Sequence, residues 1–109
     1  MRVKYDINTK YCCQIGYPLD YSCAAYVHNE MYDFANQNAI CLSVEVKPEE
    51  LEDFIKANKA MHMLGFDITT PHKTRIIEYC DVVDEASYIF KCVNHVRWEG
   101  VKLVGVGLD

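Results

Sequence analysis

The sequence has no apolar run long enough to cross a membrane, and residues 1–6 lack the apolar stretch of a secretory signal. We therefore expect a cytoplasmic protein with no membrane partner. Basic residues are few, 11 against 16 acidic ones, and they are scattered along the chain. A nucleic-acid surface needs clustered positive charge to displace counterions, so we also expect no nucleic-acid partner.

Cysteine and histidine lack the spacings that metal and redox sites require. None of the six cysteines forms a C-x-x-C pair, and no cysteine–histidine array has zinc spacing. Because no signal sequence points to an oxidising compartment, we expect free thiols that pack as small apolar residues. Among the histidines, His62, His72 and His95 are expected at the surface. His28 is expected in the packing of a helix.

Half of the residues are apolar, and their spacing alternates between the periods of strands and helices. Strands are predicted at 11–15, 39–46, 66–69, 89–98 and 101–106. Helices are predicted at 22–36, from Pro48 to a stop at Gly65, from Thr70 through Cys80, and at 84–86. Thr70 and Pro71 suit the N-cap and first position of a helix. The predicted buried face of the first helix comprises Val27, Met31, Phe34 and Ala35.

Strands and helices in this order predict a three-layer αβα sandwich with a mostly parallel sheet. The length of 109 residues fits a single domain. Ligands of such sheets bind beyond the carboxyl ends of the strands. This rule singles out residues 16–22, residues 69–73 and the neighbourhood of Asn94 as the candidate binding site.

Four short motifs fall at these strand ends. They read G-Y-P-L-D-Y-S at 16–22, D-I-T-T-P-H-K at 67–73, V-N at 93–94 and G-V-G-L-D at 105–109. Together they resemble the substrate domain of the shikimate dehydrogenase family, which includes quinate dehydrogenases. That family shows G-x-P-[IL]-x-H-S-x-S-P, N-V-T-x-P-x-K, G-A-V-N-T and G-x-N-T-D in the same order. The resemblance spans nearly the whole chain.

The resemblance implies an oxidoreductase that oxidises or reduces a shikimate- or quinate-like cyclic polyol with NADP or NAD. It implies that Lys73 takes the hydroxyl proton, as a lysine can in a water-poor site, with Asp109 as its acidic partner. Ser22, Thr69 and Asn94 are implied to bind the substrate. Structural roles stay open beside these: Ser22 as an N-cap, Thr69 as an ordinary strand-end residue, and Asn94 as a partner of nearby backbone.

The dinucleotide fingerprint G-x-G-x-x-G after a strand does not occur in the sequence. Under the resemblance, residues 1–109 are the substrate-binding domain, and a C-terminal nicotinamide-binding domain is missing from the chain. We therefore expect this domain alone to bind no cofactor and to be inactive without its partner domain. An unpaired sheet edge, or the surface meant for that domain, makes a homodimer a further expectation.

Several positions depart from the family pattern and leave the substrate open. Tyr21 replaces a histidine, Ala24 a carboxylate-binding serine, Asp67 the asparagine of N-V-T, and Gly107 another asparagine. An added acid and a lost hydroxyl weaken the case for an anionic ligand, so an amino or uncharged cyclitol stays in play. The alternative function is a non-catalytic small-molecule binding or sensor module that reuses the fold. The choice between NADP and NAD is also open.

Overall fold

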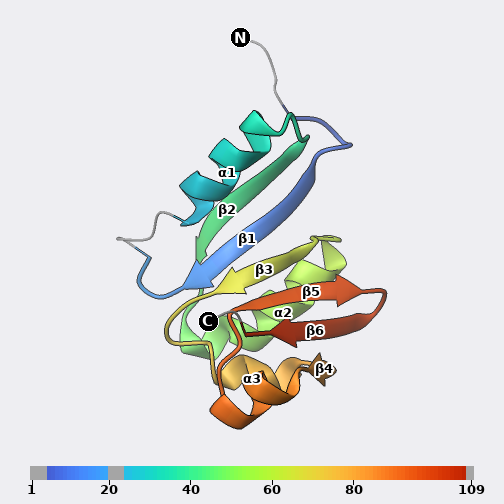
Figure 1. The fold of residues 1–109 in the computed structure, drawn as a ribbon. Coiled ribbons are helices and arrows are strands. Elements are labelled where there is room, and N and C mark those ends of the chain that lie inside the picture. The colour runs from blue at the N-terminus through green and yellow to red at the C-terminus, as the bar shows by residue number, and fades with distance from the viewer. Residues whose placement is uncertain (1–4, 20–23, 108–109) are drawn as a thin grey trace.

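The computed structural model of the chain describes residues 5–19 and 24–107. Strands and helices alternate through most of this length (Figure 1). In chain order the elements are β1 (Lys10–Gly16), α1 (Ala24–Phe34), β2 (Ala39–Glu45), the 3-10 helix η1 (Pro48–Glu50), α2 (Leu51–Ala60), β3 (Gly65–Ile68), the 3-10 helix η2 (Arg75–Tyr79), β4 (Val82–Val83), α3 (Glu85–Phe90), β5 (His95–Glu99) and β6 (Lys102–Val106). Among the described residues, no helix is both long and apolar enough to cross a membrane.

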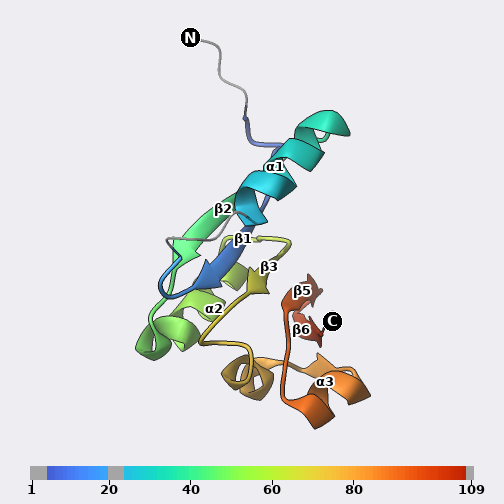
Figure 2. The same ribbon diagram turned by 60° about the vertical axis from the view of Figure 1, so that its left-hand side comes forward.

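One six-stranded sheet organises the fold, in the order β2-β1-β3-β5-β6-β4. The strand β1 pairs in parallel with β2 and β3, and β6 pairs in parallel with β4. Only β5 runs against its neighbours β3 and β6 in this sheet. The helices α1 and α2 lie on opposite faces of the sheet (Figure 2). The predicted αβα sandwich with a mostly parallel sheet is therefore confirmed.

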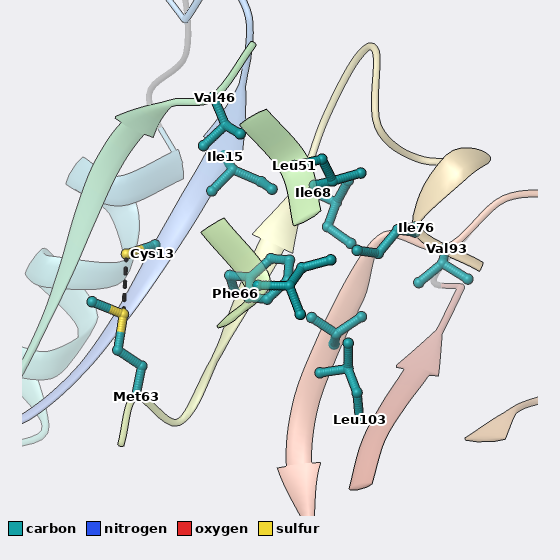
Figure 3. Packing of buried hydrophobic residues seen from close by; sticks show 12 residues of the cluster. Cys13, Ile15, Val46, Leu51, Met63, Phe66, Ile68, Ile76, Val93 and Leu103 are labelled. Carbon is teal, nitrogen blue, oxygen red and sulfur yellow. Dashed lines mark hydrogen bonds between the residues drawn. The ribbon is translucent and has the colours of Figure 1, made fainter. Parts of the chain in front are cut away.

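The hydrophobic core lies between the sheet and α2 (Figure 3). Alternate residues of β1 and β3 point to this face, because successive side chains of a strand face opposite sides. The Phe66 side chain is fully buried, and its ring meets Phe54 of α2 edge-on at 5.1 Å between centroids. The core comprises Cys13, Ile15, Val46, Leu51, Ile55, Met63, Phe66, Ile68, Ile76, Val93, Val96 and Leu103.

The predicted buried face of α1 is wrong. The side chains of Val27, Met31 and Phe34 are 46%, 62% and 96% exposed, and Ala35 is exposed too. The helix turns His28, Asn29 and Tyr32 toward the sheet instead, where they bind strand residues. The reason is that the sheet face covered by α1 presents polar and sulfur-bearing groups, which require polar partners when they are buried.

The predicted helix from Thr70 is also wrong. Residues 70–74 form turns around a cis Thr70–Pro71 peptide bond, and a 3-10 helix begins only at Arg75. His72, expected at the surface, is 1% exposed, and its Nε2 lies 2.6 Å from the Val46 carbonyl oxygen. Tertiary contacts that bury His72 and Ile76 have overridden the local helix signal at Thr70 and Pro71.

Several element boundaries also differ from the prediction. Helix α3 extends over Glu85–Phe90, with the Asp84 side chain before it accepting a bond from the Ser87 N–H, and β5 starts only at His95. The short strand β4 was not predicted. The helix α2 ends at Ala60, well before Gly65, which instead is the first residue of β3. Glycine is needed there because a Cβ would meet the Val96 carbonyl oxygen at 2.1 Å.

Candidate ligand site at the strand ends

Hydrogen bonds bring the predicted strand-end segments together at one edge of the sheet. The Thr69 N–H donates to the Ile15 carbonyl at 2.9 Å, and the Tyr17 N–H donates to the Thr70 carbonyl at 3.1 Å. These bonds extend the parallel pairing of β1 and β3 beyond the last strand residues. The loops after both strands therefore start side by side, which is the arrangement expected at a ligand-binding sheet edge.

The segment around Asn94 joins this edge because β5 runs antiparallel and starts where β3 and β6 end. The Ile68 N–H donates to the Asn94 carbonyl at 2.8 Å, and the Asn94 N–H donates to the Val106 carbonyl at 3.0 Å. The Val93 N–H donates to the Lys73 carbonyl at 2.9 Å, which fixes the turn after β3 against the start of β5.

Gly16 shows how tightly the loop after β3 approaches the end of β1. A Cβ at Gly16 would lie 2.4 Å from Thr69 Cγ2 and 3.1 Å from the Thr70 carbonyl oxygen. Glycine is required here because any larger residue would push Thr69 away from the strand end. The residue at position 16 thus positions one of the predicted ligand-binding side chains.

Three of the five predicted site residues are described, and the structure places them together. Thr69, Lys73 and Asn94 are half-buried at the edge formed by the strand ends. The Asn94 Oδ1 accepts a bond from the Cys92 thiol at 3.6 Å, so part of its amide is held locally. Ser22 and Asp109 lie outside the described residues, and the expected Lys73–Asp109 pair stays a prediction.

A cluster of two histidines and an acid lies on the same sheet face as Thr69, and sequence reasoning missed it. The Asp67 carboxylate lies between two imidazoles: His28 Nε2 is 2.8 Å from Oδ2, and His95 Nδ1 is 2.6 Å from Oδ1. The three side chains come from α1, β3 and β5. They keep 30–39% exposure, so solvent reaches the cluster.

The electrostatics of this cluster offset the charge that Asp67 adds. Burial by itself raises the pKa of Asp67. The hydrogen bond and charge of His95, with a further contribution from His28, lower the pKa by more than burial raises it. The net pKa of Asp67 lies below its usual range, so the group is a carboxylate at neutral pH. Its negative charge lies within hydrogen-bonding distance of two imidazoles, and is not presented unpaired.

Beside this cluster, two thiols lie next to each other under α1. Cys12 of β1 is the register partner of Cys41 of β2, and the Cys12 Sγ lies 3.5 Å from the Tyr32 hydroxyl. A hydrogen bond from Cys41 lowers the pKa of Cys12 most, burial opposes it, and Tyr32 adds to the lowering, giving a pKa of about 6. The five described cysteines are free thiols.

A model of the protein family described as the shikimate dehydrogenase substrate binding domain matches residues 14–96. This chain belongs to that family. The NADP(+) shikimate dehydrogenase of Methanococcus maripaludis strain C7 is 34% identical over 104 residues, which cover 95% of this chain and 37% of that protein. The resemblance inferred from the four motifs is thereby confirmed.

Solved structures of shikimate dehydrogenases share the fold. The enzyme from Aquifex aeolicus superposes with a TM-score of 0.89 at 31% identity, over 93% of this chain and 38% of that one. Shikimate 5-dehydrogenase from Listeria monocytogenes, in complex with shikimate and NAD, superposes with a TM-score of 0.92 at 26% identity, over 97% and 37%. The chain spans a little over a third of the length of these relatives.

The described residues of this chain do not fit a nicotinamide dinucleotide. Such a cofactor is held by a glycine-rich turn between a strand and a helix, whose N-terminus faces the pyrophosphate. At the end of β1, the chain has a single glycine, Gly16, followed by Tyr17 and Pro18. Within residues 5–19 and 24–107, no strand is followed by the G-x-G-x-x-G turn.

Proposed function

We propose that this chain binds a shikimate- or quinate-like cyclic polyol and serves as the substrate-binding domain of an NADP- or NAD-dependent oxidoreductase. The observation that carries the proposal is the convergence of Thr69, Lys73 and Asn94 at one sheet edge in a chain of this family. A hydroxyl and an amide orient a polyol ring without adding charge, and a lysine can take the proton of the hydroxyl that is oxidised.

The roles within the site follow from residue chemistry. Thr69 and Asn94 hold ring hydroxyls, and Lys73 accepts the proton as the alcohol becomes a ketone. We propose Ser22 as a further substrate contact and Asp109 as the acid that holds Lys73. Both assignments rest on the family motif, since these two residues lie outside the described part of the chain.

We propose that the nicotinamide-binding domain lies outside these 109 residues, and that the domain alone binds no cofactor. The support is the length of the relatives, about 37% of which this chain covers. The Methanococcus relative is named for NADP(+), whereas the Listeria structure holds NAD, so both cofactors stay in the proposal. A non-catalytic sensor module is not favoured, because the matching relatives are dehydrogenases.

The cluster around Asp67 bears on the class of ligand. The case for an amino ligand rested on the negative charge that Asp67 adds and on the hydroxyl lost at Ala24. Because two imidazoles lie 2.6 and 2.8 Å from the Asp67 carboxylate, we propose that a carboxylate-bearing ligand such as shikimate is bound in preference to an amino analogue. Calorimetric titration of the chain with both compounds tests this, and tighter binding of the amino analogue would contradict it.

A homodimer and a cytoplasmic location complete the proposal. The apolar stripe of Val27, Met31 and Phe34 on α1 is exposed and lies next to the edge strand β2, which supports pairing with a second copy. Light scattering of the wild type and of Met31→Lys measures this. Equal monomeric masses for both proteins would remove the homodimer from the proposal.

The binding experiment titrates the chain with shikimate and with quinate by calorimetry. We expect Thr69→Val and Asn94→Ala each to weaken binding at least about tenfold, since each removes a polar contact worth ~1.4 kcal/mol or more. The matched control is Lys56→Met, an exposed change on α2, which leaves affinity unchanged. No detectable binding of either polyol by the wild type would overturn the proposed function.

In the full-length enzyme, Lys73→Met tests the chemical role. We expect turnover to collapse while substrate binding and folding are largely retained, because only the proton acceptor is lost. Lys56→Met again serves as the control, because it removes the same charge at an exposed position on α2. Unchanged turnover in Lys73→Met would contradict the assignment of Lys73 as the base.

A further inference from the structure

The thiols of Cys12 and Cys41 lie on one face of the sheet in adjacent strands. The two residues are direct partners in the parallel register of β1 and β2. Neighbouring strands run about 4.8 Å apart, and disulfides join Cα atoms separated by roughly 4.4–6.8 Å. The pair therefore meets the backbone requirement for a disulfide without any change of strand pairing.

The two sulfurs differ in acidity, which gives them different chemical roles. The hydrogen bond from Cys41 holds the pKa of Cys12 at about 6, so Cys12 is mostly thiolate at neutral pH. The same hydrogen bond, together with burial, raises the pKa of Cys41 far above its usual value. Cys12 is half-buried and Cys41 is 2% exposed, so a small solute meets Cys12 first. A low-pKa, accessible thiol next to a second thiol is the arrangement of an attacking and a resolving cysteine.

We propose that Cys12 and Cys41 form an oxidation site for peroxides, at which a disulfide closes between β1 and β2. The Cys12 thiolate attacks one oxygen of hydrogen peroxide, the O–O bond breaks, and Cys12 becomes a sulfenic acid as hydroxide leaves. This hydroxide takes up from solvent the proton that the Cys12 thiol released on ionising, and forms the first water. The Cys41 sulfur then attacks the Cys12 sulfur, and the S–O bond breaks. The departing hydroxide takes the Cys41 proton as a second water. Two thiols are oxidised to one disulfide, and one peroxide is reduced to two waters.

The resolving step becomes easier once Cys12 has been oxidised. The hydrogen bond with Cys12, burial and the negative charge of the Cys12 thiolate all raise the pKa of Cys41. A neutral sulfenic acid removes the thiolate charge, so the pKa of Cys41 falls, although burial still raises it, and Cys41 becomes a better nucleophile.

The neighbouring residue Cys13 is excluded from this chemistry by its direction. Its thiol donates to Met63 Sδ at 3.5 Å on the core side of the sheet (Figure 3). Burial, with the charge of Cys12, raises the pKa of Cys13 to about 11. Cys13 is one residue away in sequence and faces the opposite side, so it provides a matched control.

The test exposes the chain to hydrogen peroxide at pH 7, blocks the remaining thiols, and maps disulfides by mass spectrometry without reductant. We expect a Cys12–Cys41 crosslink as the main product, reversed by a thiol reductant. In Cys41→Ser the Cys12 sulfenic acid has no partner, so a dimedone adduct accumulates on Cys12. In Cys12→Ser both crosslink and adduct are lost, whereas Cys13→Ser behaves as the wild type.

Other products overturn the proposal. A main crosslink from Cys12 to Cys13, or to Cys23 outside the described residues, contradicts the pairing. Dimedone labelling that persists elsewhere at full yield in Cys12→Ser contradicts the attacking role. An uncrosslinked wild type, under conditions that oxidise free cysteine in the same tube, contradicts the site itself. Fluorescence of Trp98 verifies that each variant is folded, so that these outcomes concern native protein.

Discussion

The two faces of the sheet differ although the same strands build both. On the side of α2, Cys13 and Phe66 are fully buried among apolar neighbours. On the side of α1 lie their sequence neighbours: Cys12 contacts a tyrosine hydroxyl, and Asp67 binds two imidazoles. A shift of one residue along a strand moves a side chain from one face to the other. Stability is thus concentrated on one face and titratable chemistry on the other.

The largest expected effect comes from Phe66→Ala on the core face. The change removes a fully buried ring and leaves a cavity, so we expect a loss of about 3–5 kcal/mol in the free energy of unfolding. Urea denaturation followed by the fluorescence of Trp98 measures this loss. The control Phe90→Ala removes the same side chain where it is 75% exposed, and we expect a change within about 0.5 kcal/mol. Equal losses in both variants would contradict the assignment of the core.

Thiol alkylation separates Cys12 from Cys13 directly. With pKa values of about 6 and about 11, Cys12 is mostly thiolate at pH 7 and Cys13 almost wholly a thiol. We expect iodoacetamide to modify Cys12 about 100-fold faster, after allowing for the lower nucleophilicity of the more acidic thiolate. Peptide mapping at successive times gives both rates, and the pH profile for Cys12 should have its midpoint near 6. Comparable rates at the two positions would remove the contrast between the faces.

A smaller loss is expected from Asn29→Ala on the face of α1. The Asn29 amide donates to the Cys41 carbonyl at 3.0 Å and accepts from the Cys41 N–H at 2.8 Å, which ties α1 to the edge strand. Because both backbone groups lose their partner, we expect a cost of about 1–3 kcal/mol. The control Gln37→Ala removes an amide whose hydrogen bond to the Ala35 carbonyl is exposed to solvent. It should leave the urea midpoint nearly unchanged.

The smallest effect is the pH dependence that Asp67 contributes. The folded pKa of Asp67 lies below its unfolded pKa of about 4, so its contribution to stability is fully present above that unfolded value. That contribution is lost as the pH falls through the lower folded value. The stability difference between the wild type and Asp67→Asn should therefore shrink between pH 5 and pH 2 in urea titrations. A constant difference across this range would show that the imidazoles do not stabilise the carboxylate.

Prediction from sequence succeeded where the signal is local and regular. The alternation of Ile40, Leu42 and Val44 predicted β2, and the strand-end rule placed residues 69–73 at the carboxyl end of the strand that is β3. It failed at α1, whose apolar stripe faces outward, because helix periodicity says nothing about the polarity of the surface that the helix will cover. It failed also at Thr70, where the burial of His72 outweighed a local helix-start signal.

The sequence by itself determined the alternation of strands and helices through β3, the mostly parallel sheet and the strand ends at which Thr69, Lys73 and Asn94 lie. These depend on periodicity and on short motifs, both of which are written in neighbouring residues. Only the tertiary structure decided that His28 and His95 meet Asp67 and that Cys12 faces Cys41. Those contacts depend on strand register and on helix rotation, which are fixed by packing between segments far apart in the chain.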